Sequence, residues 1–151
     1  MDCKCPTCER TYKKVHSKSS QIFFWKLYSL LNRDIQNCVY FDELNKELKF
    51  PINDTNYSLD FCILKDNKKF CLEYFGSYWH ASPDIYNWDT IIIENVMACD
   101  IWQHDYERKT YLENCGFKCE IVWEHDNIED KLNELHSCIT QYFSGKMNDN
   151  K

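Results

Sequence analysis

Two runs of β-prone residues, YSLDFCIL at positions 57–64 and KFCLEYF at positions 69–75, decide the fold of this chain. Apolar, β-branched and aromatic residues at this density favour strands. The polar segment KDNK at positions 65–68 lies between the runs and has the length and composition of a turn. The pattern therefore predicts two antiparallel strands that form a hairpin.

The sequence before this hairpin predicts one helix, one short strand and a loop. Apolar residues recur at helical spacing after Ser19, with Ser19 or Ser20 as the N-cap, and the helix is expected to end near Arg33. Residues 38–41 favour a short strand. Pro, Asn and Asp punctuate residues 51–56, which is typical of a loop.

The segment after the hairpin predicts a loop and then a long helix. Residues 76–88 are aromatic and loop-like, and an apolar stretch at 91–97 leads into residues 98–115. Gly116 follows, where a glycine cap of a helix belongs. Four side chains set the helical spacing of this segment: Ile101, Trp102, Tyr106 and Leu112.

A strand and a second helix complete the pattern. Residues 117–123 favour a strand, and Asp126 with Glu129 three residues later forms the capping-box pattern that opens a helix. The expected buried face of that helix consists of Ile128, Leu132, Leu135, Ile139 and Tyr142. The order of elements predicts an α/β (α+β) fold in which helices flank a mixed sheet.

Length and composition exclude several classes of protein. A chain of 151 residues with 44% hydrophobic side chains can bury one core unaided, which excludes a multidomain machine and a disordered chain. The longest run without Asp, Glu, Lys or Arg is residues 135–145, short of the roughly 20 residues that a membrane helix needs. Charged residues stand at the N-terminus where a signal peptide would be apolar. We expect an intracellular protein of the cytoplasm or nucleoid/nucleus.

Charge is distributed unevenly along the chain. The net charge is −6, but residues 1–33 carry seven positive and two negative side chains, a balance of +5 that leaves −11 for the remainder. A basic segment on an acidic body suits an enzyme that grips phosphate at one end and gathers carboxylates around a cation at the other. The alternative is a solvated basic tail. The basic residues expected to contact phosphate are Arg10, Lys13, Lys14 and Lys18.

Three of the ten cysteines are spaced like metal ligands. Cys5 and Cys8 form a knuckle of the type that presents two thiolates to Zn²⁺, and Cys3 and His16 could complete a tetrahedral site. The alternative is a reduced tail. No Cys-x-x-Cys lies in a strand-to-helix context, which disfavours a redox protein. Three other cysteines lie among apolar residues and are expected to act as small hydrophobes: Cys62, Cys71 and Cys119.

Two carboxylates in the hairpin are candidate ligands for a divalent metal. Asp60 interrupts an otherwise apolar stretch, where a carboxylate needs a partner or a metal. Glu73 lies in the next strand, and in an antiparallel hairpin the two could lie near the same end. Mg²⁺ prefers such oxygen ligands. The alternative is that each side chain points into water.

A histidine and an aspartate are candidates for proton transfer. His80 follows the hairpin closely, and Asp105 lies in the predicted helix 98–115. A histidine near a metal-bound water could accept its proton while an aspartate orients the ring. The alternative for each alone is an ordinary surface residue.

Taken together, these residues resemble the very-short-patch repair endonucleases. The matching features are LDF at 59–61, EYFGSYWH at 73–80, Asp105 eleven residues before Gly116, and IVWE at 121–124. They also resemble related phage homing endonucleases, the EDxHD group of the PD-(D/E)XK nuclease superfamily. The resemblance covers about residues 19–143.

The resemblance implies a restriction-endonuclease-like core and Mg²⁺-dependent hydrolysis of phosphodiester bonds in double-stranded DNA. Asp60 matches the central Mg²⁺ ligand. Tyr74 matches the second metal contact and could offer only its backbone carbonyl, so the neighbouring Glu73 is an alternative ligand.

The resemblance also implies roles for four residues outside the metal site. His80 matches the histidine that activates the attacking water, and Asp105 matches the aspartate that supports it. Tyr78 and Trp79 match aromatic residues that are wedged between base pairs and kink the duplex. For Trp79, packing in the core is the alternative.

The sequence departs from the family pattern in three places. Gln21 and apolar residues stand where the first helix should offer a glutamate, and Glu43 and Glu47 are the candidate substitutes. The lysine of the usual Glu-x-Lys motif is absent. The positions of the structural zinc ligands of the repair enzymes read Ser77, Ser82, Asp84 and His125, which predicts that this zinc is absent.

The sequence therefore divides into three parts. Residues 1–18 form a basic, Cys-rich segment with a zinc-knuckle pattern, residues 19–145 a nuclease domain, and residues 146–151 a polar tail. The leading hypothesis is a Mg²⁺-dependent DNA endonuclease. The alternative is a nuclease-fold module with a zinc knuckle that binds nucleic acid but has lost catalysis.

Overall fold

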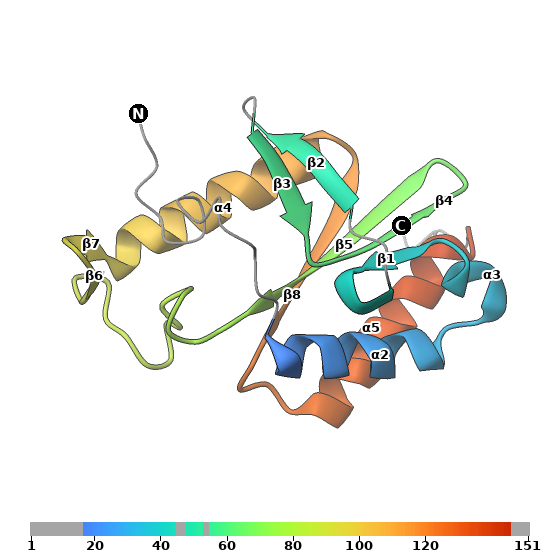
Figure 1. The fold of residues 1–151 in the computed structure, drawn as a ribbon, viewed down its shortest axis with the longest axis horizontal. Coiled ribbons are helices and arrows are strands. Elements are labelled where there is room, and N and C mark those ends of the chain that lie inside the picture. Colours follow the sequence, from blue (N-terminus) through green and yellow to red (C-terminus); the bar gives the residue numbers. More distant parts are fainter. Residues whose placement is uncertain (1–16, 45–47, 53–54, 146–151) are drawn as a thin grey trace, which may run out of the picture.

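A four-stranded mixed sheet forms the centre of the protein. The computed structural model describes residues 17–44, 48–52 and 55–145 (Figure 1). The sheet has the order β1-β4-β5-β8, and its strands are β1 (Val39–Phe41), β4 (Phe61–Lys65), β5 (Lys68–Phe75) and β8 (Phe117–Trp123). The helices of the described residues are α2 (Lys18–Leu30), α3 (Arg33–Gln36), α4 (Ala98–Asn114) and α5 (Ile128–Phe143), with a 3₁₀ turn η1 (Asp42–Leu44). The predicted fold class, a mixed sheet flanked by helices, is confirmed.

The predicted hairpin is present as β4 and β5. The two strands pair antiparallel, and Asp66 and Asn67 form the turn between them with φ of 52° and 61°. Positive φ at both central residues is the geometry of a two-residue hairpin turn, which Asp and Asn tolerate better than most residues. After β5 the chain crosses through α4 and returns as β8, which pairs parallel to β5.

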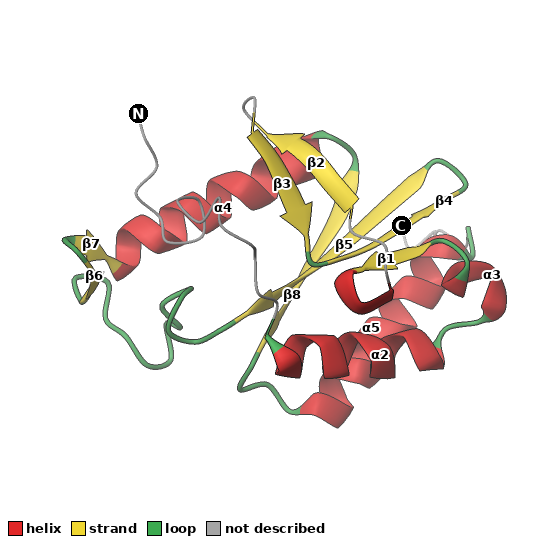
Figure 2. Cartoon of the chain, in the orientation of Figure 1, coloured by secondary structure: helices red, strands yellow, loops and turns green. Residues whose placement is uncertain are grey.

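The side chains of the sheet alternate between two covered faces. On one face, Phe61, Ile63, Phe70 and Leu72 pack in a buried core with residues of α2 and α5. The other face carries Cys62 and Cys71, which pack with Leu112 of α4. Figure 2 shows α2 and α5 together on one side of the sheet and α4 on the other. The fold therefore has three layers.

The first helix begins and ends differently from the prediction. Its N-cap is Ser17, whose Oγ accepts a hydrogen bond from the backbone N–H of Ser20 at 3.2 Å. The helix ends at Leu30, and a separate short helix, α3, follows with Asn32 as its N-cap. The prediction of Ser19 or Ser20 as the cap was wrong, because several serines in a row give similar capping patterns.

The predicted strand 57–64 is broken at Asp60. Residues 57–59 belong instead to β3 (Thr55–Leu59), which pairs antiparallel with β2 (Leu48–Ile52), so the predicted loop 51–56 is largely strand. Pro51 is tolerated because this two-stranded ribbon leaves it an unpaired edge. The break places Asp60 between two strands.

One small hairpin was not predicted, and one further helix cap was predicted wrongly. The apolar stretch 91–97 forms a small hairpin of β6 (Ile91–Ile93) and β7 (Val96–Met97), which the sequence did not predict. The N-cap of α5 is Asn127, whose side chain accepts from the N–H of Asp130, whereas Asp126 accepts from the N–H of Trp123. Of the expected buried face of α5, Leu132, Leu135 and Ile139 are buried, Tyr142 is partly buried and Ile128 is exposed.

The N-terminal predictions lie outside the described residues. This applies to the zinc ligands Cys3, Cys5, Cys8 and His16 and to the basic residues Arg10, Lys13 and Lys14, which stay predictions. Lys18 is described and is exposed at the start of α2. Within the described part of the chain, no helix is long and apolar enough to cross a membrane. The seven cysteines of that part are all free thiols.

The core on the α2 side predicts a large loss of stability for one substitution. Phe24 is fully buried among Phe41, Phe61 and Tyr74, so Phe24→Ala should lower the free energy of unfolding by about 3–5 kcal/mol. Ile22 lies on the same helix but is 47% exposed, so Ile22→Ala should change it by only about 0.5 kcal/mol. Urea unfolding of both variants checks this, and similar losses would contradict the assignment of the core.

Candidate active site

Strand register brings two carboxylates to the face of the sheet that α4 covers. Phe61 of β4 pairs with Leu72 of β5, so Asp60, one residue before Phe61, stands opposite Glu73. Facing residues of an antiparallel pair point to the same side, and both carboxylates share the side of Cys62 and Cys71. Asp60 and Glu73 are each only 8% exposed.

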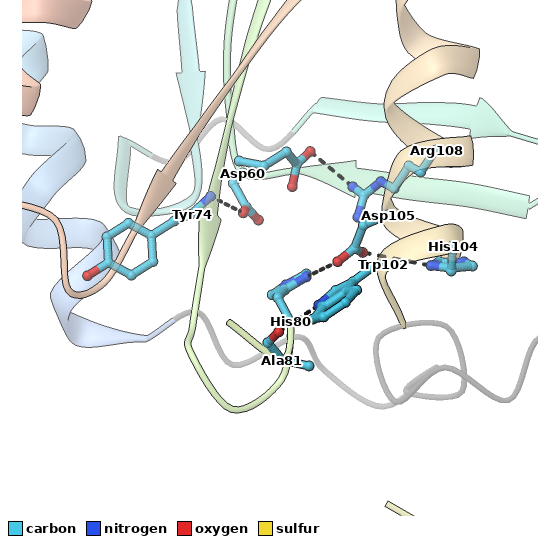
Figure 3. Close-up of polar contacts among 9 residues, drawn as sticks. Asp60, Tyr74, His80, Ala81, Trp102, His104, Asp105 and Arg108 are labelled. Carbon is cyan, nitrogen blue, oxygen red and sulfur yellow. Dashed lines mark hydrogen bonds and ion pairs between the residues drawn. The ribbon is translucent and has the colours of Figure 1, made fainter. Parts of the chain in front are cut away.

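The backbone of β5 holds Asp60. Its Oδ2 accepts a hydrogen bond from the amide N–H of Tyr74 at 3.0 Å (Figure 3). The Tyr74 ring lies on the opposite face, where it packs against Phe23 and Phe24. The side chain of Tyr74 therefore lies away from Asp60, and only the backbone of Tyr74 contacts that carboxylate.

An arginine of α4 with a 12% exposed side chain holds Glu73. Nη2 of Arg108 lies 3.0 Å from Oε1 of Glu73, and its guanidinium lies over the ring of Tyr57 at 5.1 Å. Burial opposes the charge of Arg108, but the negative charges of Glu73, Asp60 and Asp105 outweigh it and raise the arginine's pKa. Arg108 is therefore charged in the site.

His80 and Asp105 form a hydrogen-bonded pair. Nδ1 of His80 lies 2.8 Å from Oδ2 of Asp105, and Figure 3 shows the two side chains directed toward each other. Asp105 lines the same pocket as Glu73 and Arg108. The His80 ring also stacks on Phe75, with ring centres 3.7 Å apart and planes 2° apart. The imidazole is thus fixed on one edge by a carboxylate and on one side by an aromatic ring.

The loop that carries His80 is a tight series of turns. The N–H of His80 donates to the carbonyl of Gly76, and the N–H of Ser82 donates to that of Ser77. Ala81 has a φ of 47°, a strained value for a residue with a side chain. Its carbonyl accepts a hydrogen bond of 2.6 Å from Nε1 of Trp102 on α4 (Figure 3). These contacts anchor the loop to the same helix that supplies Asp105.

Two histidines lie beside the Asp105 carboxylate. Burial alone would raise the pKa of Asp105, but its interactions with His104, at 3.9 Å, and with His80, at 2.8 Å, outweigh burial, so the pKa is lowered. The Asp105 carboxylate therefore stays ionised at neutral pH. An ionised partner keeps the proton of a neutral His80 on Nδ1 and leaves Nε2 as the acceptor.

The donors at the strand break suit a hard cation. Mg²⁺ is typically held by one or two carboxylates and completed by water and substrate phosphate, and Asp60 with Glu73 offers two carboxylates. Among the described residues, no group of three or more His, Cys, Asp and Glu side chains is placed to hold a metal ion. The two carboxylates are oxygen donors of the kind that Mg²⁺ accepts.

The other predicted site residues lie outside this cluster. Tyr78 is 44% exposed and its hydroxyl donates to the carbonyl of Ile92, while Trp79 is half-buried and makes an edge contact with Tyr78. Glu43 is the partner of the indole N–H of Trp25, and its own backbone N–H donates to the side chain of Gln21. Glu47 lies outside the described residues.

The positions that match zinc ligands in the repair enzymes form a hydrogen-bonded chain instead. Oγ of Ser77 lies 3.1 Å from Nδ1 of His125, and Nε2 of His125 lies 3.2 Å from Oδ2 of Asp84. Ser82 is buried nearby in the same loop. The chain links this loop to the end of β8.

Sequence reasoning missed Arg108. Positions 101, 105, 108 and 112 form one helical stripe, in which Ile101 and Leu112 are buried and the two charged residues lie between them. That spacing was the signal that could have found Arg108. Tyr106, which the sequence placed in the helical pattern, is 67% exposed instead.

Comparison of the chain with models of protein families, with curated proteins and with solved structures finds no match.

The contacts of Asp105 predict a loss of stability in acid. Because the pKa of Asp105 in the folded protein is below its ordinary value of 3.8, the ionised group stabilises the fold above that pH, and the contribution is lost as the pH falls below it. The free energy of unfolding of the wild type should therefore fall as the pH drops below about 4. In Asp105→Asn this fall should be smaller. The exposed Asp89→Asn is the control for urea unfolding across pH, and equally steep falls in both would contradict the assignment.

Proposed function

We propose that this protein is a Mg²⁺-dependent DNA endonuclease with a PD-(D/E)XK-type core of the EDxHD kind. The observation that carries the proposal is the 2.8 Å bond between His80 and Asp105 beside the strand break at which Asp60 faces Glu73. A general base with its orienting carboxylate next to two buried carboxylates is an arrangement suited to hydrolysis of a phosphodiester.

His80 is the general base of the proposed reaction. With Nδ1 bonded to Asp105, the neutral ring accepts a proton from the attacking water at Nε2. Asp105 then stabilises the imidazolium that forms, and the stacked Phe75 keeps the ring from rotating. Asp105 acts through His80 and is a positioning residue.

Asp60 is the central ligand of the proposed cation, and Glu73 or the backbone carbonyl of Tyr74 supplies the second contact. A bound Mg²⁺ polarises the phosphate and neutralises charge that develops on it. The N–H of Tyr74 and the guanidinium of Arg108 orient the two carboxylates before a cation arrives. Preorganised ligands of this kind reduce the cost of binding.

Contact with the duplex is assigned to aromatic side chains and to the basic N-terminal segment. The segment 76–107 contains six acidic residues and no Lys or Arg, so its contact with DNA depends on stacking rather than on charge. Tyr78 is exposed and Trp79 is half-buried in that segment. The basic residues Arg10, Lys13, Lys14 and Lys18 supply the electrostatic attraction to the phosphates.

Two observations favour the second candidate, an inactive module that binds nucleic acid. Gln21 stands where a catalytic carboxylate is expected and is buried against the backbone of Glu43. Arg108 occupies one oxygen of Glu73. The two candidates differ in one property, the cleavage of DNA.

Plasmid nicking tests the proposal. Wild-type protein should nick supercoiled DNA in Mg²⁺ but not in EDTA, and Asp60→Asn should abolish nicking because it removes a ligand charge at constant size. Asp66→Asn, in the exposed turn of the same hairpin, is the matched control and should nick normally. Wild-type protein that binds DNA without nicking it would favour the inactive module, and normal nicking by folded Asp60→Asn would contradict the metal ligand.

The role of His80 predicts a loss of rate without a loss of affinity. His80→Ala should lower the single-turnover rate by about 10²- to 10⁴-fold, the usual range for a positioned base. His136→Ala on α5, behind the opposite face of the sheet, should leave the rate unchanged. Poor DNA binding by His80→Ala with a normal rate at saturation would make His80 a phosphate contact instead.

The role of Trp79 predicts the reverse pattern. A base-stacking side chain is worth about 1–3 kcal/mol per base, so Trp79→Ala should weaken DNA binding and leave the rate at saturating DNA close to that of the wild type. Trp25→Ala, on α2 at the other face of the sheet, is the control for loss of an indole. Fluorescence anisotropy with a labelled duplex measures the affinity. Unchanged binding would assign Trp79 to packing alone.

A further inference from the structure

Arg108 lies among carboxylates in a place from which water is largely excluded. The side chains of Arg108 and Glu73 are only 12% and 11% exposed, and the two are 3.0 Å apart. Removing one partner of a buried ion pair leaves a charge without compensation. The guanidinium therefore has an electrostatic role that packing alone would not require.

Among the described residues, the charges around Arg108 do not cancel. Asp60, Glu73 and Asp105 contribute three negative charges and Arg108 one positive charge, while His80 is neutral in its role as a base. The group therefore carries two excess negative charges. One divalent cation would take the group to zero, and a second would take it to +2 in a buried environment, where like charges repel strongly.

The hydrogen bonds of Arg108 also indicate a counter-charge. Its Nε is buried and, within the described residues, has no hydrogen-bond partner, although Nη2 bonds to Glu73. One side of the guanidinium lies over the Tyr57 ring. The group is held by charge and by an aromatic surface rather than by a full set of hydrogen bonds.

We propose that Arg108 is the resident counter-charge of the Asp60–Glu73 pair, and that it lowers the pair's affinity for an added divalent cation and limits the site to one such ion. The proposal rests on the function proposed above, because it concerns the same cation. It assigns Arg108 as a positioning residue that remains in the site when the cation binds.

Binding of Mn²⁺ to the full-length protein, followed by the electron paramagnetic resonance of the free ion, tests the proposal without DNA. The difference between wild type and Asp60→Asn gives the binding that belongs to this site. Arg108→Met keeps the length of the side chain without its charge, and Arg108→Lys keeps the charge without the planar fork. Lys109→Met removes a neighbouring, more exposed cation of α4 and is the matched control.

The expected result separates charge from packing. Wild-type protein should bind one Asp60-dependent Mn²⁺ per chain, and Arg108→Met should bind it about tenfold more tightly or better, because a like charge has been removed. Arg108→Lys and Lys109→Met should each stay within about threefold of the wild type, since both keep the charge next to Glu73.

Two results would overturn the inference alone: Arg108→Met binding no more tightly than Lys109→Met, or two Asp60-dependent ions in the wild type. Equal binding by wild type and Asp60→Asn would instead overturn the cation of the proposed function together with the inference. Should Arg108→Met not fold, the double variant Glu73→Gln/Arg108→Met is expected to recover folding, because it removes the uncompensated carboxylate. If the double variant is as unfolded as Arg108→Met, the assignment of Arg108 as the counter-charge is wrong.

Discussion

The burial of Asp60 opposite Glu73 is the constraint on which the rest of the site depends. The pairing of Phe61 with Leu72 fixes the register of the two strands. A one-residue slip would exchange the side chains that β4 directs to the two faces of the sheet. Two facing carboxylates with 8% exposure need compensation. The N–H of Tyr74 and the guanidinium of Arg108 provide it.

Helix α4 has to serve two requirements along one stripe. Ile101 and Leu112 bury it against the sheet and the loop, while Asp105 and Arg108 between them meet His80 and Glu73. Because the two charged residues are three positions apart, they lie on the same face of the helix, about one turn from each other. The crossover from β5 to β8 thus carries both charges that complete the site.

Phe75, two residues after Glu73, contributes an aromatic surface to the site. Its ring stacks on His80 and carries no charge. The positive charge beside Glu73 comes from Arg108, which lies on a different element. The site thus combines a histidine bonded to Asp105 with carboxylates whose net charge is reduced by an arginine.

The sequence alone determined what depends on short-range patterns. The β4–β5 turn, α4 with Gly116 after it, β8 and most of the buried face of α5 follow from periodicity and turn residues within each segment, and the candidates Asp60, Glu73, His80 and Asp105 came from motif spacing and resemblance. Only the tertiary structure decided that residues 51–56 pair as strands, that Asp60 interrupts β3 and β4, and that Arg108 completes the group. Each of these depends on a contact between elements that a single segment does not reveal. Strand β2 forms by pairing with β3, and an arginine in a helix gains its role only when the sheet brings Glu73 within 3.0 Å.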